Sequence, residues 1–215
     1  MEALNLESLN LKTGDLILFS SNNSGLFALF DKLIKLFTNS DYNHIGMVLK
    51  DPTFIDENLK GLYLYESSWE GEPDPADGKI KLGVQITPLE EAFKNNPGNA
   101  YLRRIIAPTE NEYTRVFAES NIIDVYKKTN AKPYDLNPVD WIEAFFRIDP
   151  TFKFGKDKRF FCSALVGYIY QQLGILQKNT DWSILRPSDF SLEDNNRHIF
   201  YENGFKLDTS QETIY

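Results

Sequence analysis

The chain has 215 residues and a formal net charge of −8, because 31 acidic side chains outnumber 23 lysines and arginines. Such an acidic chain is a poor match for nucleic-acid binding, which draws its affinity from basic patches. Hydrophobic residues make up 42% of the chain and charged residues 25%, as in ordinary globular proteins. We therefore expect one domain spanning residues 1–215, with a sizeable core and no nucleic-acid partner.

The cysteine content and the apolar runs bear on where the protein works. A single cysteine excludes an intramolecular disulfide. The first 15 residues show no basic segment followed by an apolar one, so no signal peptide is expected. No apolar run reaches the ~20 residues of a spanning helix. These features favour a cytoplasmic location, while a virion or host compartment and peripheral contact with a membrane stay open.

Strand-like and helical patterns follow one another along the chain in a distinctive order. Short apolar or alternating runs predict strands, and apolar residues at helical spacing predict helices. The expected strands are 13–20, 44–50, 62–68, 79–87 and 100–106, and the expected helices are 24–38, 109–129, 137–148 and 160–175. Mostly strands followed by mostly helices predict an α+β fold with an antiparallel sheet.

Two of the expected helices carry further signals. The 24–38 helix has an apolar stripe, which suits packing on a core and would also suit contact with a membrane surface. The 109–129 helix begins with Thr109 three residues before Glu112, the spacing of a capping box. The segment 69–78, rich in acidic residues, proline and glycine, is expected to be an exposed loop.

The residues able to perform chemistry are few. Cys162 is the only cysteine, and His44 and His198 are the only histidines. A zinc site of the usual Cys/His type needs three or four such ligands, and no glycine-rich phosphate loop occurs. We therefore expect neither a metal nor an organic cofactor, which leaves thiol chemistry, carboxylate chemistry or none.

Cys162 lies at the start of the predicted 160–175 helix. Unpaired backbone N–H groups and the helix dipole favour a thiolate there, and a thiolate is a nucleophile. The preceding Lys156, Lys158 and Arg159 add positive potential. The alternative is that Cys162 only packs, since free cysteines are among the most buried residues.

His44 begins a predicted strand, and Glu66 lies in the next one. If the two strands pair with His44 opposite Glu66 and Leu49 opposite Gly61, the imidazole and the carboxylate share one face. A carboxylate there would orient the imidazole and stabilise its protonated form. A different register would leave Glu66 in solvent. His198 lies in a polar, turn-rich region and is the weaker candidate.

These segments occur in the order seen in a known family. They are "GDLILF" at 14–19, "SDYNHIGMVL" at 40–49, "YESS" at 65–68, "GVQITPLEEAF" at 83–93, "KPYDLN" at 132–137 and "FFCSALVGYIYQQLG" at 160–174. The chain resembles the YiiX/YebB-like branch of the NlpC/p60 superfamily, the permuted papain-fold cysteine hydrolases, over about residues 13–190. The histidine precedes the cysteine, as in that permuted branch.

The resemblance implies a fold and a reaction. The fold would be a permuted papain-like α+β core, with the cysteine helix packed on the sheet that carries the histidine. Cys162 would be the nucleophile, His44 the general base and Glu66 the orienting acid. The reaction would be cleavage of an amide bond through a thioester acyl-enzyme, as in amidases and peptidases, on a peptide or small amide. A lipid-directed acyltransferase or thioesterase acting on a lipid acyl substrate is an alternative, and so is a non-catalytic binding protein on the same scaffold.

Overall fold

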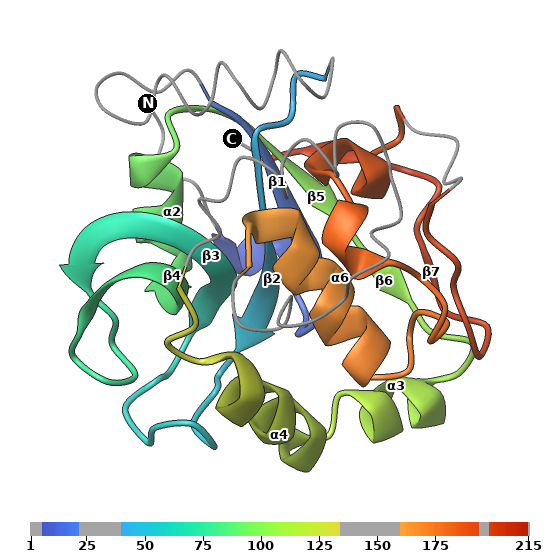
Figure 1. Ribbon diagram of the computed structural model, residues 1–215, viewed down its shortest axis with the longest axis horizontal. Helices are drawn as coiled ribbons and strands as arrows, with labels where there is room; N and C mark the ends of the chain where they lie inside the picture. Colours follow the sequence, from blue (N-terminus) through green and yellow to red (C-terminus); the bar gives the residue numbers. More distant parts are fainter. Residues whose placement is uncertain (1–5, 22–39, 134–159, 194–197, 215) are drawn as a thin grey trace.

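We describe a computed structural model of the chain over residues 6–21, 40–133, 160–193 and 198–214 (Figure 1). The expected helices 24–38 and 137–148 lie outside these ranges, as do Lys156, Lys158 and Arg159. The described strands are β1 (Leu16–Ser21), β2 (His44–Lys50), β3 (Leu62–Pro73), β4 (Ile80–Pro88), β5 (Gly98–Arg103), β6 (Ile105–Ile106), β7 (Lys206–Leu207) and β8 (Glu212–Thr213). The α-helices are α2 (Leu89–Asn95), α3 (Glu110–Val116), α4 (Glu119–Thr129) and α6 (Cys162–Gln172), and the short 3₁₀ turns are η1 (Leu6–Leu9), η3 (Trp182–Ile184) and η4 (Pro187–Phe190).

The centre of the fold is a six-stranded sheet in the order β4-β3-β2-β1-β5-β8, in which every pairing is antiparallel. The expected α+β class with an antiparallel sheet is confirmed, whereas the permuted papain-like arrangement stays a prediction. The central strand β1 is buried on both faces, which explains why its sequence is a continuous apolar run rather than an alternating one. Within the described ranges no helix is long and apolar enough to cross a membrane.

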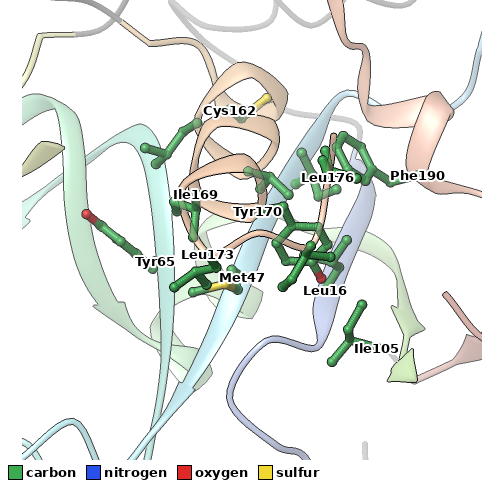
Figure 2. Packing of buried hydrophobic residues seen from close by; sticks show 14 of the residues in the cluster. Leu16, Met47, Tyr65, Ile105, Cys162, Ile169, Tyr170, Leu173, Leu176 and Phe190 are labelled. Carbon is green, nitrogen blue, oxygen red and sulfur yellow. The ribbon is translucent and has the colours of Figure 1, made fainter. Parts of the chain in front are cut away.

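Each face of the sheet is covered by its own hydrophobic cluster. Helix α6 crosses one face in front of β2 (Figure 1). Figure 2 shows Tyr170 of α6 beside Leu16, and Leu173, which directly follows α6, beside Met47. The Tyr170 hydroxyl also donates to the Gly14 carbonyl at 2.6 Å. The other face is covered by α2 and by residues near both ends of the chain, and its cluster includes Phe19, Val48, Leu64, Phe93 and Ile214. The cysteine-bearing helix therefore packs on the sheet that contains β2.

The expected helix over 109–129 is wrong, because the structure has two helices, α3 and α4, separated at Phe117 and Ala118. The start is as expected: the Thr109 hydroxyl accepts from the Glu112 N–H at 3.1 Å. The break is stabilised by Asn121, whose side-chain amide donates to the last carbonyls of α3, those of Arg115 and Val116. A short polar side chain competing for backbone groups in this way ends helices that periodicity alone would continue.

The segment expected to be an exposed loop over 69–78 is partly strand. β3 continues to Pro73 and pairs with β4 through Trp69↔Leu82 and Pro73↔Ile80, with an irregularity between them. The turn between β3 and β4 is stabilised by the buried Asp74, whose Oδ2 lies 2.5 Å from Lys81 Nζ. This buried ion pair stabilises the pairing of β3 with β4, and a polar loop sequence does not reveal it.

The C-terminal residues form two short strands, each with its own partner: β7 pairs with β6, and β8 extends the main sheet beside β5.

Gly46 is a point of close contact between β2 and β3. A Cβ atom added there would lie 2.5 Å from the Leu64 side chain, which is itself fully buried. We predict that Gly46→Ala lowers the free energy of unfolding by about 1–3 kcal/mol, the usual cost of overpacking a core, as measured by urea denaturation.

The matched control is the same change in a Leu64→Ala background, where the space is open. There Gly46→Ala should cost clearly less than in the parent. Equal costs in the two backgrounds would show that Leu64 is not the obstacle.

Candidate active site

His44 and Glu66 form a buried pair at the start of β2. His44 Nε2 lies 2.5 Å from Glu66 Oε2. Glu66 is fully buried, and His44 is 9% exposed. An imidazole and a carboxylate at this distance, with little water to screen them, attract each other strongly.

The predicted register between the two strands is wrong by two residues. Leu49 pairs with Tyr63 rather than with Gly61, and continuing this register places Glu66 across from Gly46. Because side chains alternate with a period of two, a shift of two keeps Glu66 on the face of His44. The pair is therefore diagonal rather than directly opposite, which is still within reach of a long glutamate side chain.

Two aromatic rings support the imidazole on the same face. Phe19 of β1 pairs directly with His44, and the two rings lie 5.6 Å apart at an angle of 32°. Phe93 of α2 packs on Phe19 in turn, at 5.8 Å. These contacts leave the imidazole little freedom to rotate away from Glu66.

Cys162 is the first residue of α6, after Phe161 in extended conformation. β2 and α6 both begin toward the upper side of Figure 1, so His44 and Cys162 lie at the same end of the sheet. A side-chain hydrogen bond to Cys162 is one of the causes that raise the pKa of His44. Since Glu66 occupies Nε2, the ring nitrogen left for Cys162 is Nδ1.

The electrostatic surroundings favour the protonated form of the imidazole. Burial by itself lowers the pKa of His44, but hydrogen bonds to Cys162 and Glu66, together with electrostatic interactions with both, raise this pKa well above its usual 6.5. The protonated form of His44 is therefore favoured, between a carboxylate and a sulfur atom.

Of the residues named from the sequence, the structure thus brings together Cys162, His44 and Glu66. His198 is half-buried in the segment before β7 and is not among the groups that shift the pKa of His44. In the described ranges no three His, Cys, Asp or Glu side chains are grouped as metal ligands would be.

Ser67, the residue after Glu66, was not predicted to have a role. Ser67 is fully buried, and its hydroxyl donates to the Phe160 carbonyl at 2.6 Å. The available signal was a small polar residue at a position of β3 that faces the core, but strand alternation alone does not reveal its partner.

No family model matches the chain, and a search of curated proteins finds no match.

We predict that Glu66→Gln lowers the pKa of His44, because the change removes a charged hydrogen-bond partner while burial still opposes protonation. NMR titration of the imidazole signals measures this, with His198→Gln to assign the two histidines. Glu193→Gln is the matched control, since this carboxylate is exposed, accepts from Ser40 and does not act on His44. An unchanged His44 pKa in Glu66→Gln would contradict the pairing.

The same variant should lose stability in a pH-dependent way. A histidine whose pKa is raised in the folded state stabilises the fold fully below its unfolded pKa of 6.5, and this stabilisation is lost as the pH rises through the folded value. Glu66→Gln should therefore cost most at about pH 6, at most about 3–5 kcal/mol, the range for removing one partner of a buried ion pair. The cost should shrink toward pH 9 in urea denaturation series.

Proposed function

We propose that the protein is a cysteine hydrolase that cleaves an amide bond, with Cys162 as nucleophile, His44 as the group that transfers protons and Glu66 as the residue that orients His44. The observation that carries this proposal is the position of His44, with Glu66 at 2.5 Å on one ring nitrogen and Cys162 as its second hydrogen-bond partner. Nucleophile, base and orienting acid in series are the general signature of an activated nucleophile. The ordered segments that resemble permuted papain-fold hydrolases point to the same chemistry.

The raised pKa of His44 supports an ion-pair resting state. A raised pKa favours the imidazolium, which can donate a proton to a leaving group and stabilises a thiolate beside it. Glu66 maintains this state because its charge keeps the proton on the imidazole. The low exposure of all three side chains limits screening by water.

In the first half of the reaction the Cys162 sulfur attacks the amide carbonyl carbon, and a C–S bond forms. The C–N bond then breaks as His44 gives its proton to the departing nitrogen, which leaves as a free amine. The product on the enzyme is a thioester, and His44 is now neutral.

In the second half His44 takes a proton from water, and the resulting hydroxide attacks the thioester carbonyl. The C–S bond breaks, the carboxylic acid leaves and the thiolate–imidazolium pair is restored. If an alcohol or amine replaced water, the acyl group would be transferred instead. Proton transfer of this kind contributes ~10²–10⁴-fold to enzyme rates.

The start of α6 is suited to stabilise the negative oxygen that forms during both steps. The first backbone N–H of α6 to bond back along the chain is that of Leu165, to the Phe161 carbonyl at 3.0 Å. The N–H groups of 162–164 belong to the first turn and have no partner within the helix. The Cys162 N–H is next to the nucleophile, where a developing oxyanion requires a donor.

The proposal is tested by trapping the acyl-enzyme. The protein is mixed with p-nitrophenyl esters and p-nitroanilides that carry short peptide or fatty-acyl groups, quenched in acid, and examined by intact-mass and peptide mass spectrometry. We expect a mass increase equal to the acyl group on Cys162, and none in Cys162→Ala. His44→Ala should slow turnover by at least ~10²-fold, whereas His198→Ala should leave it unchanged.

Two results would contradict the proposal. One is the absence of any adduct on Cys162 across the whole panel, which would favour a binding protein. The other is hydrolysis that proceeds equally in Cys162→Ala.

A further inference from the structure

Ser67 links β3 to the segment that leads into α6. Its side chain is fully buried, and the hydroxyl donates to the Phe160 carbonyl over 2.6 Å. This is a tie between residues 93 positions apart in sequence. Phe160 lies two residues before Cys162, a stretch that spans at most about 7 Å of chain.

Phe160 is held from three sides. Ser67 binds its carbonyl, its N–H donates to the Pro133 carbonyl at 3.2 Å, and its ring packs on Tyr168 and Trp182 at 5.1 and 5.5 Å. Of the three, the Ser67 bond is the one that comes from the same strand as Glu66. The hydrogen bond from Ser67 to Phe160 therefore fixes the position of Cys162 relative to β3.

Glu66 and Ser67 are successive residues of one strand, so their side chains leave it on opposite faces. Glu66 reaches the imidazole of His44, while Ser67 reaches the chain that carries the thiol. A single strand thus sets both the orientation of the imidazole and the position of the nucleophile. Because the two contacts start from adjacent residues, the flexibility of one peptide unit limits how far Cys162 can be displaced relative to His44.

We propose that Ser67 is a positioning residue that holds Cys162 within hydrogen-bonding distance of His44 through the Phe160 carbonyl. This inference rests on the proposed function, because it deepens the account of the same site. The Ser67 hydroxyl donates to the Phe160 carbonyl, so its effect on the site must appear in the coupling between Cys162 and His44. Displacements of about 1 Å at a nucleophile can cost ~10²-fold in rate.

The test compares Ser67→Ala with Ser191→Ala, a matched control in which a buried serine hydroxyl also donates to a backbone carbonyl, that of Ser188 at 2.8 Å. Two readouts are used: the rate of Cys162 alkylation by iodoacetamide at pH 6.5 and at pH 9, and the pKa of His44 from NMR. We expect Ser67→Ala to slow alkylation at pH 6.5 by about 10-fold or more, with little change at pH 9.

The His44 pKa keeps this test independent of whether the protein is a hydrolase. Because the bond to Cys162 raises that pKa, a displaced thiol should lower it in Ser67→Ala even if no substrate is ever found. If acyl-enzyme trapping fails but the His44 pKa is lowered in Ser67→Ala, the hydrolase proposal is contradicted and the positioning role of Ser67 is supported.

The conservative variant Ser67→Thr keeps the hydroxyl, so it should retain the alkylation rate at pH 6.5 and the His44 pKa of the parent. If Ser67→Ala does not fold, Ser67→Thr alone tests the positioning role. The inference is overturned if folded Ser67→Ala matches Ser191→Ala within about twofold at pH 6.5 and keeps the His44 pKa of the parent. It is equally overturned if folded Ser67→Thr loses both properties.

Discussion

The buried contact between His44 and Glu66 is the interaction on which the proposed site depends, because neither group could keep its charge at that depth alone. A charged carboxylate without a partner would be costly in the interior, and burial alone drives the imidazole toward its neutral form. At 2.5 Å the imidazole pairs with Glu66 Oε2, while Glu66 Oε1 is buried without a hydrogen-bond partner in the described part of the chain. The same contact sets which ring nitrogen faces Cys162, so it controls both the protonation and the direction of the imidazole.

The rest of the molecule can be understood as the support for this contact. The β2–β3 register brings the two residues to one face, and Gly46 leaves room between the strands for Leu64. Phe19 packs against the imidazole, and α2 packs on Phe19 on the same face of the sheet. Helix α6 packs on the opposite face, and its first residue, Cys162, lies at the end of the sheet. The hydrophobic clusters on the two faces thus supply the low-dielectric surroundings that make the ion pair effective.

Much of this arrangement was predictable from the sequence, for reasons that differ from residue to residue. The strands were recognisable from short apolar and alternating runs. The predicted contact between His44 and Glu66 was correct despite a two-residue error in register, because side chains on a strand return to the same face every two residues. The helical periodicity of 109–129 was also real, but it could not reveal that Asn121 ends α3 by binding its last carbonyls. The role of Ser67 was not predictable, since its partner lies 93 residues away and is a backbone carbonyl, which carries no sequence signal.

The most direct test of the central claim is the pH dependence of Cys162 alkylation by iodoacetamide between pH 5 and 9, in the parent, in His44→Ala and in His198→Ala. Cys162 is the only cysteine, so the rate reports on it alone, and a small reagent suits a side chain that is 2% exposed. The account predicts rapid alkylation of the folded parent below pH 7, unchanged in His198→Ala and largely lost in His44→Ala until the pH is raised. A thiol that reacts only after unfolding, or whose pH profile is the same without His44, would contradict the ion pair and with it the hydrolase.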